Sequence, residues 1–230
     1  MKLIVLFILI WFLGPSAYAQ DQNFVEIDSL YKEDQAYVGI TYNLFGKIAD
    51  SVSQSGFSSG FHIGFIKDIP INKRRNLAIG IGLGYSANSF NQNLLIAKNS
   101  EKEVTYRILA DSDSFTKNKF SLHILEVPLE FRWRSSTLEE YKFWRIYTGF
   151  KLGYLITHTT KYIGSPMDQK YSDIDHFNDF QYGLTMSIGY NTWNIHLYYG
   201  LNTIFNDKAV LNGNPIEMNA IKIGLMFYLL

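Results

Sequence analysis

Acidic and histidine side chains gather in one polar segment of this chain, where they could support hydrolysis or hold a metal ion. Carboxylates and imidazoles are common general acids and bases and common ligands of zinc. Their spacing here matches neither the nucleophile elbow of serine hydrolases nor the helical His pair of zinc proteases. We therefore interpret them as solvated loop residues and predict no catalytic residue, cofactor or metal; a surface enzyme that uses the His176 loop is the alternative. The residues are His158, Asp173, Asp175, His176 and Asp179.

A second set of charged residues lies in segments whose apolar residues recur at every second position. The charged residues have the opposite parity, so in a strand they point to the opposite face. An unpaired buried charge is costly, so we predict an ion-paired network that plugs the interior of the fold. A role of these charges in conduction or gating is the alternative. The predicted network consists of Glu126, Glu130, Arg132, Arg145 and Lys151.

The segment that shows the two-residue period most clearly is 77–86. Leu77, Ile79, Ile81, Leu83 and Tyr85 share one face, whereas small residues, several of them glycines, share the other. This length matches a tilted strand that crosses a bilayer. Eight such strands are expected, and a β-bulge near Leu125 would reconcile a change of parity in the fourth. They cover about 37–44, 60–65, 77–86, 120–134, 146–156, 180–190, 193–201 and 221–229.

The predicted fold is all-β: an eight-stranded, antiparallel, up-and-down transmembrane β-barrel of the outer-membrane type. A secreted β-sandwich also alternates and is the competing fold. Three features favour the barrel: long apolar faces, glycine on the opposite faces, and large aromatic residues at one set of strand ends. These aromatic residues form a predicted interfacial girdle. They are Trp133, Trp144, Tyr190 and Trp193.

Composition excludes several classes of function. The formal net charge of zero gives no support for binding nucleic acid. The chain has no cysteine, which excludes disulfides, thiolate metal sites and thiol catalysis. Its mean hydropathy of -0.05 argues against a helical membrane protein. A small-molecule substrate is not predicted either.

The first residues have the features of a cleaved signal peptide. Lys2 precedes an apolar run, and Ala17-Tyr18-Ala19 has the small-x-small form of a cleavage site. We predict a signal peptide at 1–19, a periplasmic tail at 20–36 and the barrel at 37–230, with location in the cell outer membrane. An uncleaved N-terminal anchor is the alternative.

The predicted connections alternate between long and short, which is typical of outer-membrane barrels with both termini in the periplasm. The long connection at 87–119 contains a predicted hairpin strand at 104–109. A short periplasmic turn at 67–76 is basic, so it could meet a periplasmic partner or anionic headgroups, with a merely solvated turn as the alternative. Its cations are Lys67, Lys73, Arg74 and Arg75.

Four segments of the chain resemble the PorT family of Bacteroidota: YKEDQAYVGITYNLF at 31–45, DIPINKRRNLAIGIGLGY at 68–85, NQNLLI at 91–96 and LEVPLEFRW at 125–133. This resemblance implies an outer-membrane protein needed for protein export by the type IX secretion system, which supports gliding motility in some species. It implies no catalytic residue or cofactor. The expected function is thus a non-catalytic accessory or assembly role, with the lipid bilayer and proteins of that system as partners. A stand-alone structural or small-solute barrel is the alternative.

Overall fold

The computed structural model describes residues 34–110, 112–135 and 143–229. The predicted signal peptide and the predicted tail up to residue 33 lie outside these residues. The described residues contain no helix that is long and apolar enough to cross a membrane.

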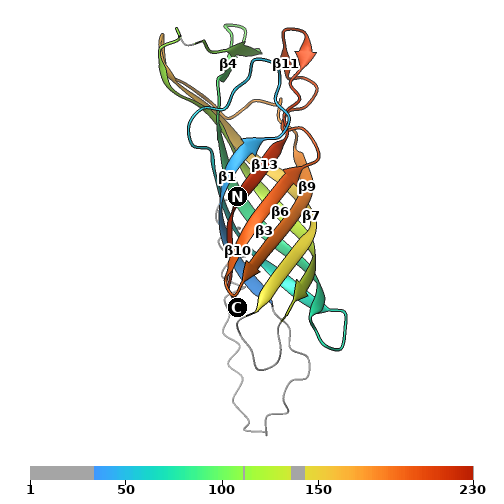
Figure 1. Ribbon diagram of the computed structural model, residues 1–230. Coiled ribbons are helices and arrows are strands. Elements are labelled where there is room, and N and C mark those ends of the chain that lie inside the picture. The colour runs from blue at the N-terminus through green and yellow to red at the C-terminus, as the bar shows by residue number, and fades with distance from the viewer. Residues whose placement is uncertain (1–33, 111, 136–142, 230) are drawn as a thin grey trace, which may run out of the picture. The chain divides into compact units, whose positions relative to one another are not determined.

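Eight long antiparallel strands close into a single barrel (Figure 1). Their order around the wall is β6-β3-β2-β1-β13-β10-β9-β7, and pairing between β6 and β7 closes the ring. The prediction of an eight-stranded, up-and-down, outer-membrane-type barrel is confirmed. The strands are β1 (Gln35–Phe45), β2 (Ser59–Pro70), β3 (Leu77–Asn91), β6 (Phe115–Arg134), β7 (Trp144–Gly164), β9 (Phe180–Tyr190), β10 (Trp193–Gly200) and β13 (Ala220–Leu229).

Two unlike faces run along each wall strand. Apolar side chains such as Ile81, Leu83 and Ile195 are exposed on the outside. The inward positions hold polar residues and glycines, and these glycines allow close approach. A Cβ on Gly84 would lie only 2.0 Å from Tyr37 Oη, and one on Gly224 would lie 1.9 Å from a backbone oxygen of Ile40. The wall therefore presents hydrocarbon to lipid and crowds polar side chains into the lumen.

Several strands extend farther toward the long-loop end than the two-residue period predicts. β3 continues to Asn91, and β6 begins at Phe115. The bulge predicted in the fourth strand is wrong: β6 alternates between inward and outward residues without interruption, and Leu122 and Ile124 point into the lumen, whose outer part is apolar. The register shift between His123 and Ile124 instead reflects an extra residue, Ile156, in a bulge on β7. Beyond this shift, outward positions are polar, so the hydrophobic pattern ends while the hydrogen-bonded ladder continues.

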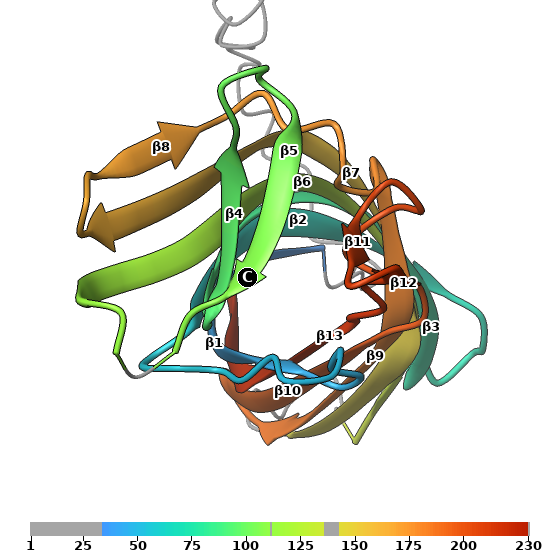
Figure 2. The same cartoon turned by 90° about the horizontal axis from the view of Figure 1, so that it is seen from above.

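The long connections fold together above the barrel at this end. β4 (Leu94–Lys98) pairs with β5 (Val104–Ile108) as a separate hairpin, which lies over part of the opening in Figure 2. The predicted hairpin strand thus exists, as the second arm of this small sheet. The remaining short strands are β8 (Gln169–Tyr171), β11 (Val210–Leu211) and β12 (Asn214–Pro215). Since long loops of such barrels are extracellular, we name this the outer end and the opposite one the periplasmic end.

Candidate functional site

Glu126 lies at the centre of the lumen and is buried. Lys151 Nζ lies 2.9 Å from its Oε2, and Ser86 Oγ donates a 2.7 Å hydrogen bond to its Oε1. His62 Nδ1 lies 3.8 Å from the same carboxylate. One carboxylate on β6 thus contacts side chains from β2, β3 and β7, which ties four strands together across the interior.

Two further polar contacts extend this central layer. Thr41 Oγ1 lies 3.0 Å from His62 Nε2, and Ser187 Oγ lies 2.7 Å from His196 Nδ1. Lys222 Nζ sits 4.8 Å from the centre of the Tyr198 ring. All of these side chains are buried. Their inward direction follows from strand parity, but their contacts depend on the stagger of strands around the barrel, which local sequence does not show.

A second charged layer lies nearer the periplasmic end. Asp68 accepts from both Arg132 Nη1 and Arg134 Nη1 at 2.8 Å, and all three side chains are almost fully buried. Arg132 Nε also lies 3.6 Å from a carboxylate oxygen of Glu130, and Arg132 donates to the Gln35 side chain. Asp68 was missed from sequence because it appeared to belong to the turn; β2 in fact continues to Pro70.

Aromatic rings support this arginine layer. The Arg132 guanidinium lies 4.0 Å from the centre of the Tyr147 ring and 5.6 Å from that of Tyr228. Arg combines a planar, weakly hydrated cation with several donors, so it can stack and pair at once. Tyr147 and Tyr228 belong to a buried cluster with Tyr37, Ile66 and Met226, which packs this level of the lumen with side chains.

The predicted charge network is therefore divided between two layers. Glu126 and Lys151 meet in the central layer, whereas Glu130 and Arg132 meet in the periplasmic one. Arg145 is buried, and its guanidinium lies 4.5 Å from the centre of the Phe143 ring. Among the described residues it has no ion-pair partner, which differs from the predicted pairing. Arg145 is directly opposite Arg134 on β6, and the Asp68 carboxylate at this level is already occupied by Arg132 and Arg134.

The outer part of the lumen is apolar. Phe90, Phe120 and Phe45 stack there, with Phe120 also against Phe177 and Phe205 from the loops. Buried loop residues such as Leu94 and Ile174 continue this core above the wall. Between the apolar part and Glu126 there is a gap of about 10 Å³. Such a gap has room for about one water molecule at most.

The acidic and histidine residues of the outer loops are spread among separate contacts. Lys98 pairs with Asp173, and Lys208 with Asp175, each at 2.6 Å; the hydrogen bonds from these lysines lower the pKa of both carboxyls. In the described part of the chain, no group of three or more His, Cys, Asp or Glu side chains is arranged to hold a metal ion. We retain the interpretation that these residues serve the loops.

His158 and His176 have packing roles in these loops. The backbone N–H of Ile174 donates to His158 Nε2 at 3.1 Å. His176 Nδ1 lies 2.8 Å from Tyr106 Oη, and the two rings stack. Burial lowers the pKa of His176, although the Asp175 carboxylate opposes this effect. His176 thus joins the β5 arm of the hairpin to the loop after β8.

The four residues of the predicted aromatic girdle all lie at the periplasmic end of the wall. Trp144 and Tyr190 are directly opposed on β7 and β9, with ring centres 5.5 Å apart. Trp193 is paired with Tyr190 across the next turn, and its ring contacts Phe227. Trp133 is paired with Leu77 at the same level. Rings with an apolar body and a polar tip suit the boundary between hydrocarbon and headgroups.

The basic residues predicted for the periplasmic turn have three different environments. Lys73 and Arg74 are exposed at its tip, at 71–76. Arg75 is half-buried, has a φ of 57°, and its carbonyl accepts a 3.0 Å hydrogen bond from Arg134 Nε. Lys67 is not in the turn: it lies within β2 on the outward face, because the ladder with β3 continues to Pro70. Lys73 and Arg74 are thus exposed at the tip of the turn, and Lys67 is exposed on the wall.

A closed eight-stranded barrel with an apolar outside, a filled lumen and a one-sided aromatic girdle defines an outer-membrane β-barrel protein. A family model described as "Outer membrane protein beta-barrel domain" matches residues 18–206, so the chain belongs to that family. The protein is thus located in the outer membrane. No curated protein matches the sequence.

Comparison with solved structures finds other membrane barrels. Ail, the attachment invasion locus protein of Yersinia pestis, is 12% identical, with 87% of this chain and 100% of that chain covered and a TM-score of 0.35. The Ail complex with the heparin analogue sucrose octasulfate is 11% identical over the same shares, with a TM-score of 0.35. A mutant of Rh. blastica porin is 8% identical, with 86% and 100% covered and a TM-score of 0.21.

Proposed function

We propose that this protein is a non-catalytic component of the outer membrane that is required for protein export by the type IX secretion system. In this proposal the barrel is an anchor for accessory or assembly contacts and does not itself conduct cargo. The observation that carries the proposal is the filled lumen: two charged layers and an apolar core occupy it, and the gap between the apolar part and Glu126 is only about 10 Å³. A folded or extended polypeptide has no room in it.

The exposed connections are then the surfaces left for partners, because function on a rigid scaffold concentrates in its loops. The segments that resemble PorT most specifically are the YKEDQ tail at 31–35, the turn with PINKRRN and the loop with NQNLLI. The tail up to residue 33 lies outside the described residues. Within the loop, Gln92 and Leu94 are fully buried in the outer core. Within the turn, Lys73 and Arg74 are exposed. We therefore assign partner binding in the periplasm to the tip of the turn at 71–76.

Deletion of the gene, followed by comparison of the secreted proteomes, tests the proposal. We expect cargo that carries the C-terminal export signal to disappear from the medium, and gliding to be lost where the species glides. Unchanged export would contradict the secretion role.

Complementation then tests the turn. The variant with Lys73→Glu and Arg74→Glu should insert as a folded barrel yet fail to restore export. The matched control, Lys47→Glu with Lys208→Glu, reverses the same amount of charge at the outer end and should restore it. If both variants restore export equally, the turn is not the partner surface.

The alternative of a stand-alone small-solute barrel predicts a different result. Such a protein would give steady single-channel currents in a planar bilayer, and its deletion would leave signal-bearing cargo in the medium. A filled lumen favours the absence of such currents.

A further inference from the structure

A row of lysines crosses the outer end of the wall. Lys119 on β6 is directly opposite Lys161 on β7, and Lys161 is directly opposite Lys170 on β8. Directly opposed residues in a sheet point to the same face, and adjacent strands lie about 4.8 Å apart. Lys117 lies two residues from Lys119 along β6 and therefore has the same parity. Its neighbours Asn118 and Phe120 are buried inward, so Lys117 and Lys119 face outward.

None of these four lysines forms an ion pair with an acidic residue within 34–110, 112–135 or 143–229. Like charges directly opposite each other destabilise a sheet. Three other lysines at this end, Lys47, Lys98 and Lys208, each pair with a carboxylate. The row thus concentrates positive charge with no carboxylate of the described residues to balance it, which favours an anion from outside the chain.

An apolar hollow of about 680 Å³ lies on the wall beside the row. Small residues form its floor, including Gly60, Ala87 and Ser121, while Ile40, Tyr42, Phe57 and Phe61 rise around it. A second hollow, of about 500 Å³, contains Lys117 and Lys119 and shares Phe57, Ser59 and Ser89 with the first. The two hollows are thus adjacent on the wall, and their sizes are those of ordinary ligand sites.

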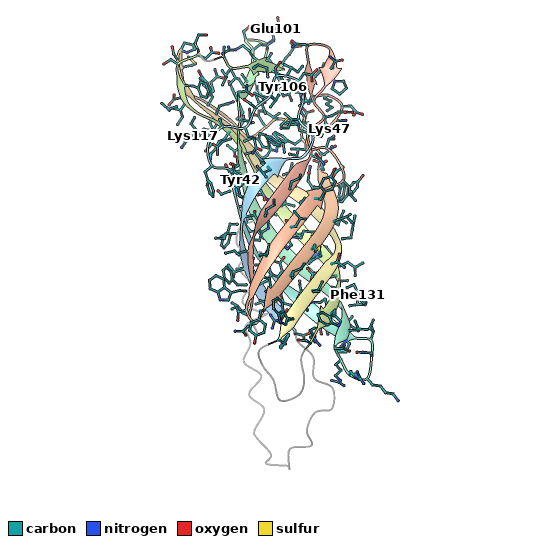
Figure 3. The ribbon with its side chains drawn as sticks, viewed as in Figure 1. Tyr42, Lys47, Glu101, Tyr106, Lys117 and Phe131 are labelled. Carbon is teal, nitrogen blue, oxygen red and sulfur yellow. The ribbon has the colours of Figure 1, made fainter. Side chains whose placement is uncertain are left out.

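The position of the hollows relative to the membrane follows from the outward side chains. Leu125, Val127 and Leu129 face lipid on β6, and above the bulge they give way to His123, Ser121 and the lysines. His123 Nδ1 lies 2.5 Å from Tyr85 Oη, a polar contact typical of the interface. Figure 3 labels Lys117 above Tyr42 on the same side of the barrel. The hollow is therefore at the depth of acyl chains of the outer leaflet, and the lysines are at the depth of headgroups.

We propose that this wall is a binding site for a phosphorylated glycolipid of the outer leaflet, of the lipid A class. An acyl chain lies in the apolar hollow, and a phosphate contacts Lys117, Lys119 and Lys161, with Lys170 completing the row. An acidic protein or a free polyanion would satisfy the lysines but would leave the apolar hollow without a ligand. This site is independent of the proposed secretion role.

The test uses the full mature chain, purified in a mild detergent, and native mass spectrometry to measure lipid affinity. The probes are bisphosphorylated lipid A, its enzymatically dephosphorylated form, phosphatidylethanolamine and inorganic phosphate. We expect bisphosphorylated lipid A to bind with the highest affinity and inorganic phosphate alone not to bind. Equal binding of the dephosphorylated lipid, or phosphate binding as strong as that of the lipid, would overturn the proposal.

Two variants examine the two halves of the site. Lys119→Gln with Lys161→Gln and Lys170→Gln should weaken binding roughly fivefold for each lysine, since a cation near an anionic lipid surface contributes about that much. The control, Lys47→Gln with Lys98→Gln and Lys208→Gln, removes the same charge from paired lysines and should leave affinity unchanged. Equal losses in both triples would show nonspecific attraction and overturn the site.

Ala87→Leu with Ser121→Leu fills the hollow without a change in charge. We expect it to lower the affinity for lipid A at least tenfold while gel mobility of the unboiled protein still shows a closed barrel. Unchanged affinity in this folded variant would contradict the assignment of an acyl chain to the apolar hollow.

Discussion

Lys151 Nζ and Glu126 Oε2 lie 2.9 Å apart in the middle of the lumen, and both side chains are buried. The ion pair joins β7 to the adjacent strand β6, and the same carboxylate reaches Ser86 on β3 and His62 on β2. Loss of one member of a buried pair leaves the other charge without compensation. Substitution of either residue therefore tests how much this ion pair contributes to the free energy of unfolding of the barrel.

Glu126→Gln should destabilise the barrel by about 3–5 kcal/mol, the usual effect of breaking a buried pair. Adding Lys151→Met to this variant should recover part of the loss, because the ammonium that paired with Glu126 is then removed too, whereas the buried Lys222 keeps its charge. Denaturant titration in detergent, followed by the mobility difference between folded and unfolded protein on a gel, measures the free energy of unfolding. Lys47→Gln, at an exposed pair with Glu217, is the control and should change it by less than about 1 kcal/mol.

Asp68→Asn should be as harmful as Glu126→Gln, because Asp68 accepts hydrogen bonds from two buried arginines. The amide can accept from one guanidinium but carries no charge to balance either, so a loss of about 3–5 kcal/mol is expected. The same titration measures it, with Asp207→Asn at an exposed loop position as control. Equal stability of the two variants would mean that water reaches the arginine layer.

The lumen should stay closed to ions even without the outer hairpin. Replacement of residues 94–108 by a short Gly-Ser linker removes β4 and β5 but leaves both charged layers in place. Planar-bilayer recordings should show no steady unitary current for either the full chain or this variant, with a general porin as positive control. Currents that appear on removal of the hairpin would show that the loops, and not the lumen, form the barrier.

Acid should loosen the outer loops through His176. Burial lowers its pKa from the ordinary value of 6.5, so the folded loops favour the neutral ring that contacts Tyr106. The contribution to stability is complete above pH 6.5 and is lost as pH falls through the lower pKa of the folded state. Lys208 acts in the same direction as burial, and Asp175 opposes it.

Hydrogen exchange of the loop amides at pH 7.5 and pH 5, corrected for intrinsic rates, measures this effect. Protection around 104–108 and 174–177 should decrease at the lower pH while that of the wall strands remains. His176→Gln should abolish the difference at 104–108, whereas the amide of Ile174 should still respond through His158, which accepts its hydrogen bond and whose pKa is also lowered by burial. A difference that persists at 104–108 in this variant would assign the acid response to another group.

The existence and order of the wall strands were predictable, because side-chain direction within a strand depends only on parity. The same rule places Glu126, Glu130, Arg132 and Lys151 inside the lumen. The change of face predicted near Leu125 is wrong, because β6 alternates without interruption and its inward residues become apolar in the outer part of the lumen; the bulge lies on β7. Apolar residues alternate strongly in these segments, and in a membrane barrel all of the outward positions face the same environment, the lipid.

The extent of the strands was less predictable where the lipid contact ends. The ladder of β2 continues through Lys67 and Asp68 to Pro70, so a residue expected in a turn becomes the acceptor for two arginines. Likewise β6 and β7 continue beyond the membrane with polar outward residues. Backbone hydrogen bonds stabilise these extensions of the strands. Their outward residues do not alternate as apolar residues, so the sequence pattern does not predict them.

The barrel and the set of inward charges could thus be predicted from local sequence, since each depends on neighbouring residues along one strand. The contact partners of those inward charges could not be predicted from local sequence. Glu126 contacts Lys151 and Ser86, and Arg132 contacts Asp68 and Tyr147, through the stagger of strands distant in sequence. The lysine row at Lys119, Lys161 and Lys170 also forms only once β6, β7 and β8 are in register. Register is a property of the closed ring, so these contacts appear only in the folded molecule.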